Sequence, residues 1–193
     1  MKTIVTILTE GYADWEIGLL TAVARGFYDV RTLFATPGGQ PVTSAGGLKV
    51  TPDLAIETID AEALDALVVC GGSSWKKPGA PDIAKIVNAV HKAGRLVGGI
   101  CDGTLALART GVLDDLAHTS NGKGYLDESG YGGAKRYLDV PQAVSDKNVV
   151  TAPATAPVTF MAKILEGIGV GDTQLSYYIG LYGTEHGRGK QAA

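Results

Sequence analysis

The sequence predicts a single α/β domain, built as a three-layer sandwich around a mostly parallel, flavodoxin-like central sheet. Short apolar runs that fit strands buried on both faces alternate with segments whose apolar residues recur at helical spacing. This alternation favours parallel strands joined by crossover helices. A chain of 193 residues is long enough to build one full hydrophobic core. We expect this domain to cover residues 1–183 and a flexible polar tail to follow over 184–193.

Apolar runs predict the main strands of the sheet. The runs are Thr3–Leu8, Asp29–Ala35, Leu64–Cys70, Arg95–Ile100 and Val149–Ala152. Between the second and third run, residues 41–59 contain Gly46-Gly47 between apolar residues and predict a hairpin or a short excursion at one edge. Residues 121–138 are rich in glycine, serine and tyrosine and have no clear period, which predicts a loop over the carboxyl end of the sheet. This loop is either a surface connection or a cover for the substrate.

Helices are predicted between these strands. The first begins after Asp14, its expected N-cap, and runs to Gly26; the second follows Pro81 and runs to Gly94. A third helical pattern begins directly after Cys101. Two more follow near the end of the chain, with apolar stripes formed by Val158, Met161, Leu165 and Ile168, and by Leu175, Tyr178, Ile179 and Tyr182.

Composition disfavours several classes of function. Seventeen basic and twenty acidic residues give a net charge of −3, and no basic run suits nucleic acid or an anionic membrane. No apolar stretch approaches the ~20 residues that cross a bilayer, and the start of the chain lacks the pattern of a signal peptide. The two cysteines, Cys70 and Cys101, are too few for a disulfide framework and lack zinc spacing. We therefore expect a cytoplasmic protein without a metal or other cofactor.

The most informative stretch is Gly99-Ile100-Cys101-Asp102-Gly103, where a buried-strand pattern stops and a helical pattern begins. This arrangement predicts a nucleophile elbow with cysteine in place of serine. The flanking glycines relieve the clashes of so tight a turn, which leaves the sulfur exposed. The free amide groups and the dipole at the helix start favour the thiolate, so we expect a reactive Cys101 with a lowered pKa. Cys70 has no such context, and we expect it to be structural.

Two glycines and a glutamate extend the predicted site. Gly71 and Gly72 end the preceding strand, so their amides should point into the same crevice at the carboxyl end of the sheet. The Gly72 and Asp102 amides would then form an oxyanion hole, although glycine pairs are also common in simple strand-to-helix loops. Glu16 opens the first helix, where a glutamate suits the helix dipole even without a catalytic role.

Taken together, Glu16, the Gly71-Gly72 pair and the GxCxG motif around Cys101 resemble the ThiJ/PfpI superfamily, a branch of the class I glutamine amidotransferase-like fold. The similarity runs from Thr3 to about Ile168. It implies that Cys101 is the reactive centre and that a protonated Glu16 hydrogen-bonds to its thiolate. Burial beside a negative sulfur would raise the carboxyl pKa and lower that of the thiol, so that two acids share one proton. Relatives are usually homodimers, and similar proteins are labelled intracellular proteases or amidases.

The third member of the site is open between His118 and Asn121. Many relatives have a histidine directly after the cysteine or on the following strand, whereas Asp102 follows the cysteine here and alignment puts Asn121 at the position of the strand histidine. Residues three apart on a regular strand face opposite ways, so only one of the two can face the sulfur. His118 would supply a general acid-base partner, and Asn121, which the alignment favours, would supply only hydrogen bonds. Asp102 either caps the new helix or acts as a polar partner, as in a branch similar to isocyanide hydratases.

Three functions fit these residues. The first is a cysteine-dependent hydrolase, amidase or lyase that acts on a small carbonyl, amide or nitrile-like substrate. The second is a redox or stress-sensing protein in which Cys101 is oxidised without conventional turnover. The third, a nucleotide-binding module, is disfavoured because the loops after the first and third main strands lack phosphate-binding glycine motifs. We expect a small-molecule substrate and a homodimer.

Overall fold

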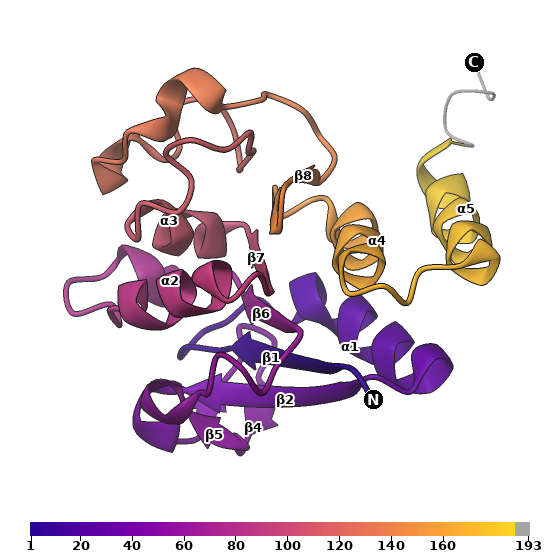
Figure 1. Ribbon diagram of the computed structural model, residues 1–193, viewed down its shortest axis with the longest axis horizontal. Helices are drawn as coiled ribbons and strands as arrows, with labels where there is room; N and C mark the ends of the chain where they lie inside the picture. Colours follow the sequence, from indigo (N-terminus) through magenta and orange to yellow (C-terminus); the bar gives the residue numbers. More distant parts are fainter. Residues whose placement is uncertain (188–193) are drawn as a thin grey trace.

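The structure is a computed structural model that describes residues 1–187, and it has helices on both faces of a central sheet (Figure 1). The sheet has the strand order β5-β2-β1-β6-β7-β9-β8, and every neighbouring pair is parallel except β8 and β9. The predicted three-layer sandwich with a mostly parallel sheet is therefore confirmed. The strands are β1 (Thr3–Ile7), β2 (Arg31–Thr36), β5 (Leu54–Ala55), β6 (Ala66–Val69), β7 (Leu96–Ile100), β8 (Val144–Asp146) and β9 (Val149–Ala152).

The hairpin predicted within residues 41–59 is present, but it lies outside the main sheet. Strands β3 (Val42–Thr43) and β4 (Lys49–Val50) pair with each other in an antiparallel two-stranded sheet. The edge beside β2 is instead occupied by the two residues of β5. The sequence did not predict β5 or β8, because strands of two or three residues are too short to show a period.

Helices α1 (Asp14–Tyr28) and α4 (Pro157–Gly167) cover one face of the sheet, and α2 (Ala84–Lys92) and α3 (Asp102–Ala108) cover the other (Figure 1). Helix α5 (Thr173–Gly187) packs beside α4 at the outside of the molecule. Residues 184–187 of the predicted tail belong to this helix, and residues 188–193 lie outside the described part of the chain. Short 3-10 turns occupy Pro37–Gly39, Ile56–Thr58, Ser73–Lys76, Asp127–Ser129 and Gly133–Arg136.

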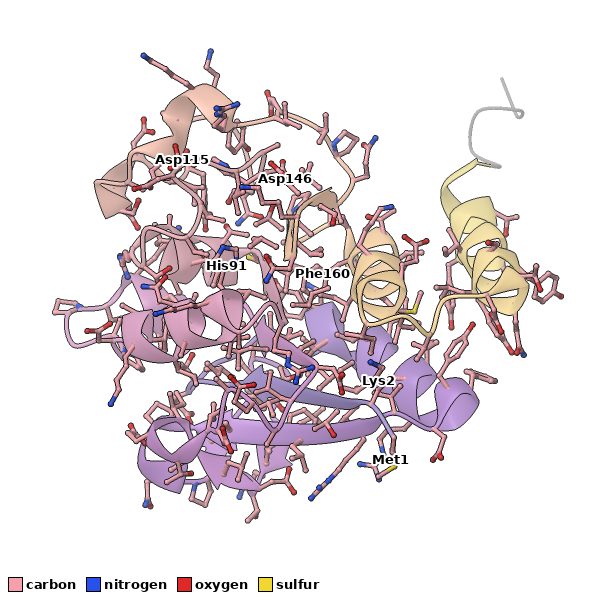
Figure 2. The ribbon with its side chains drawn as sticks, viewed as in Figure 1. Met1, Lys2, His91, Asp115, Asp146 and Phe160 are labelled. Carbon is pink, nitrogen blue, oxygen red and sulfur yellow. The ribbon has the colours of Figure 1, made fainter. Side chains whose placement is uncertain are left out.

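Strand β7 is held tightly from both sides of the sheet. A Cβ atom built at Gly98 would lie 3.2 Å from the ring of Phe160, the buried α4 residue labelled in Figure 2. A Cβ atom at Gly99 would lie 2.6 Å from the side chain of Leu107 in α3. Glycine at both positions lets the two helices pack this closely on the strand without displacing those side chains. The end of β7, where Cys101 follows, is therefore fixed by the core.

Asp14 does not cap α1 as expected. The N-cap is Ala13, and Asp14 is the first helical residue. Its carboxylate accepts hydrogen bonds from the Ser44 hydroxyl and, at 3.0 Å, from the Gly46 amide. The aspartate thus ties the β3–β4 hairpin to the start of α1, an interaction between residues about thirty positions apart that helix-capping rules do not predict.

None of the helices within residues 1–187 is long and apolar enough to cross a membrane.

Candidate active site

The candidate site lies at the carboxyl ends of β1, β6, β7 and β9, around Cys101. This residue follows β7 directly and is the N-cap of α3, with φ 55° and ψ −126°. A non-glycine residue with positive φ is strained and persists only where the surrounding structure imposes it. The turn also requires Gly103, since a Cβ atom there would lie 2.2 Å from the Val69 carbonyl oxygen. The predicted nucleophile elbow is present.

The side chains of Glu16 and Cys101 meet over Gly71. Glu16 is fully buried, and its Oε2 accepts a hydrogen bond from the Gly71 amide at 2.9 Å. A Cβ atom at Gly71 would lie 2.4 Å from Glu16 Oε2 and 2.7 Å from Cys101 Cβ. The other carboxyl oxygen, Oε1, is buried without a hydrogen-bond partner among the described residues. A buried oxygen of this kind is much easier to accommodate in a protonated carboxyl group than in a carboxylate.

The electrostatics of this pair differ from expectation in one respect. Burial raises the pKa of Glu16 to about 7, while hydrogen bonds with the Cys101 thiol and the Gly71 amide oppose the rise. Burial raises the pKa of Cys101 to about 12; Asn121 lowers it, and the Glu16 and Asp102 carboxylates raise it. The expected lowering of the thiol pKa is therefore wrong in direction, because the half-buried sulfur lies near two carboxyl groups. Above about pH 7 the two acids hold one proton between them.

Asn121, and not His118, faces the sulfur. The Asn121 Nδ2 donates a hydrogen bond to Cys101 Sγ at 3.3 Å, and its Oδ1 accepts one from the Ala154 amide at 2.9 Å. The second bond fixes which end of the amide points at the sulfur. An N–H donor at this position stabilises a thiolate more than a thiol.

His118, also named above as a candidate, lies away from the sulfur in an aromatic environment. Its buried ring donates from Nδ1 to the Leu116 carbonyl at 2.8 Å, and Nε2 lies 3.1 Å from the Tyr131 hydroxyl. The Tyr131 and Tyr137 rings lie edge-on to it at centroid distances of 5.4 and 5.7 Å. Burial lowers the pKa of His118, so this histidine is a neutral core residue that anchors the 121–138 loop. His118 therefore forms no catalytic dyad with Cys101.

Asp102 is neither the cap of α3 nor in hydrogen-bond contact with the sulfur. It is the first residue of α3, and its Oδ1 accepts a hydrogen bond from the Tyr125 hydroxyl and lies 3.6 Å from Lys76 Nζ. The Lys76 ammonium also lies 4.3 Å from the centroid of the Tyr125 ring. Sequence reasoning did not identify Lys76 or Tyr125. The only signal was their place in segments expected near the carboxyl edge of the sheet.

The two predicted oxyanion-hole amides are free. Neither the Gly72 nor the Asp102 N–H donates to another residue in the described range. A Cβ atom at Gly72 would lie 2.9 Å from the Tyr12 Cα atom, so the loop after β1 packs directly on the glycine.

Cys70 is 1% exposed and its thiol donates to the Ala13 carbonyl at 3.4 Å, as a structural cysteine would. Within residues 1–187, no three His, Cys, Asp or Glu side chains are grouped to hold a metal ion.

A flavodoxin-like domain with a cysteine at a nucleophile elbow beside a buried glutamate defines a protein of the ThiJ/PfpI type. The profile of the DJ-1/PfpI family matches residues 2–167, and the chain belongs to this family. It is 34% identical over 177 residues to a Bacillus subtilis protein named as the uncharacterized protease YoaZ, covering 86% of this chain and 84% of that protein. It is 28% identical over 139 residues to the Caenorhabditis elegans glutathione-independent glyoxalase DJR-1.2, covering 71% and 73% of the two chains.

Solved structures agree with this assignment. The DJ-1 superfamily protein Atu0886 from Agrobacterium tumefaciens is 43% identical with a TM-score of 0.91, and the match covers 96% of this chain and all of that one. A ThiJ/PfpI family protein from Bacillus anthracis is 31% identical with a TM-score of 0.86, covering 96% of this chain and 92% of its own.

Proposed function

We propose that the protein is a cysteine-dependent enzyme that acts on small carbonyl, amide or nitrile-like compounds. The observation that carries this proposal is the meeting of the buried Glu16 carboxyl group and Cys101 over Gly71. One group can supply the nucleophile and the other can hold a proton near neutral pH, where general acid-base catalysis is most effective. One relative is named a glutathione-independent glyoxalase, and this name supports the choice of a small carbonyl compound for this chain.

In the proposed mechanism the shared proton starts on the sulfur, which has the higher pKa, and passes to the Glu16 carboxylate as the sulfur attacks, while the Asn121 hydrogen bond stabilises the thiolate that forms. The sulfur attacks the electrophilic carbon, a C–S bond forms, and the electron pair of the broken π bond moves to the oxygen or nitrogen. The free amides of Gly72 and Asp102 bind the resulting negative charge. Glu16 then donates its proton to that atom or to the leaving group. In hydrolysis, water attacks the carbon bound to sulfur and gives a proton to Glu16, and the C–S bond breaks with its electron pair returning to Cys101.

Because no histidine with a described side chain bonds to the sulfur, Glu16 is the acid-base group of this mechanism. A peptidase needs strong protonation of a poor amine leaving group, which histidine usually supplies. Additions to aldehydes and nitriles, and hydrolysis of activated amides, need less protonation of a leaving group. The proposal therefore favours small electrophiles over proteins as substrates.

The test is a panel of small aldehydes, 2-oxoaldehydes, amides and nitriles, assayed with wild type and three variants. C101S should abolish turnover of any substrate found, and E16Q should lower kcat by about 10²-fold or more. C70S is the matched control, because it changes a buried thiol that lies outside the proposed chemistry. Activity that survives C101S, or that C70S and C101S reduce equally, would overturn the proposal.

Oxidation sensing is the second candidate, and a difference in exposure supports it. Cys101 is half-buried whereas Cys70 is 1% exposed, so peroxide has access to one thiol and not the other. Mass spectrometry after mild peroxide treatment should find sulfenic or sulfinic acid at Cys101 first. Equal modification of the two cysteines would exclude this role.

We further propose that the enzyme works as a cytoplasmic homodimer and needs no cofactor, as expected from the sequence and from the family. Light scattering of the purified full-length chain tests the oligomeric state. Turnover in the presence of a chelator and without added cofactor tests whether the enzyme needs a metal or another cofactor.

A further inference from the structure

A second layer of side chains surrounds Asp102, the residue after the proposed nucleophile. Its carboxylate is bound from two sides, by the Tyr125 hydroxyl from the 121–138 loop and by the Lys76 ammonium from the turn after β6. The Asp102 side chain is 14% exposed, so these partners replace most of its hydration. The Lys76 ammonium over the Tyr125 ring joins the two partners to each other.

This arrangement bears on Cys101 through charge. The titratable groups close enough to interact electrostatically with the sulfur are Glu16 from α1, Asp102 from α3 and Cys70 from the end of β6. Of these three groups, only Asp102 is held by Tyr125 and Lys76, two residues that take no part in the proposed reaction of Glu16 with Cys101. A carboxylate next to the nucleophile opposes thiolate formation unless its charge is neutralised or directed elsewhere.

We propose that Tyr125 is a positioning residue that, together with Lys76, anchors the Asp102 carboxylate at the rim of the site and so limits its effect on the Cys101 sulfur. This inference rests on the proposed function, because it assigns a role to Tyr125 through a reactive Cys101. In this arrangement the 121–138 loop places Asn121 beside the Cys101 sulfur and Tyr125 beside the Asp102 carboxylate. Loss of the Tyr125 hydroxyl frees that carboxylate to turn and removes one donor from it.

The same loop offers a matched control. Tyr131 also donates its hydroxyl from this loop, but to the neutral His118 ring at 3.1 Å. Y125F and Y131F each remove one hydroxyl from this loop. Y125F removes the bond to Asp102 together with the contacts to Lys76 and Asn121, whereas Y131F leaves Asp102 untouched. Thermal melts of both variants establish that each is folded before rates are compared.

The readout is the rate at which the neutral reagent iodoacetamide alkylates Cys101 in the full-length protein at pH 7.5. A neutral reagent is used so that attraction to Lys76 plays no part. Y125F should leave about tenfold less thiolate, which slows alkylation only about threefold because a more basic thiolate is more nucleophilic. Y131F should react as wild type does. In the D102N background, Y125F should have no further effect, since the carboxylate on which it acts is absent.

A second set of three variants tests the lysine. K76Q should slow alkylation, K76R should restore it, and K77Q, the exposed neighbour, should match wild type. The proposal is overturned if Y125F reacts at the wild-type rate, or if the effect of Y125F persists in D102N and disappears in N121A, which would mean that the tyrosine acts through the asparagine. A different failure, in which Cys101 of the wild type reacts no faster than Cys70, would instead overturn the proposed function and this inference with it.

Discussion

Replacing Glu16 with glutamine should change how the stability of the protein depends on pH. The pKa of the Glu16 carboxyl rises from its ordinary value of 4.5 to about 7 in the folded protein. Between these values the folded state binds a proton that the unfolded state does not, so wild-type stability falls as pH rises through this window. The shift of roughly 2.5 pKa units corresponds to about 3 kcal/mol, and the full burial of the side chain justifies applying it without a discount for solvent.

Glutamine imitates the protonated carboxyl group and does not titrate. E16Q should therefore match wild type near pH 4, differ from it by less than about 1 kcal/mol at pH 5, and be more stable than wild type by about 3 kcal/mol at pH 8. Chemical denaturation with a reducing agent at pH 5, 6, 7 and 8 measures this difference. Other groups that titrate in the range, His118 among them, are common to both proteins and cancel in the comparison.

The exposed Glu62 provides the control for charge alone. E62Q removes the same formal charge from a solvent-exposed turn, so its stability should follow the wild-type curve across the range. A difference between E16Q and wild type that stays constant from pH 5 to pH 8 would refute the argument, because it would mean that Glu16 is ionised throughout or is hydrated in the folded state.

Three further predictions concern packing around the site. G71A should destabilise the protein by about 1–3 kcal/mol in a denaturant melt and also slow alkylation of the reactive thiol, because the new methyl group displaces the Glu16 carboxyl group. G103A should destabilise it at least as much, since its methyl group would meet the Val69 carbonyl oxygen, which is backbone and cannot rotate away; equal stability of G103A and wild type would contradict the elbow geometry. H118N should lower the melting temperature and leave the pH dependence of Cys101 alkylation unchanged. A shifted pH profile would instead mean that His118 acts on the sulfur.

Local sequence patterns were sufficient to predict most of the fold. The alternation of apolar runs and helical stripes depends on residues close together in the chain, so strands such as Val149–Ala152 were predicted with the bounds that the structure has. Asp14 shows the limit of this approach. Its local context predicts a helix cap, and its actual partners, Ser44 and Gly46, come from a hairpin that only the folded chain brings near.

The candidate site was predictable in its membership and less so in its electrostatics. The G-x-C-x-G pattern identified the turn at Cys101, because such a turn demands small neighbours. The pKa of the thiol was predicted in the wrong direction, because helix-start reasoning omits burial and the nearby Asp102 carboxylate. Lys76 and Tyr125 were missed for the same reason: each reaches Asp102 from a separate segment, and no spacing in the sequence encodes that contact.

The site is assembled from stretches that are distant along the chain, and the exposed connection at 77–79 divides them into two sets. Severing the backbone there would leave Glu16 and Gly71 on one fragment and Cys101 and Asn121 on the other. Neither fragment alone could hold a carboxyl group against the sulfur. Recovery of turnover on mixing would then report that the two fragments had reassembled, which makes this domain a candidate for a split-protein reporter whose signal is enzymatic.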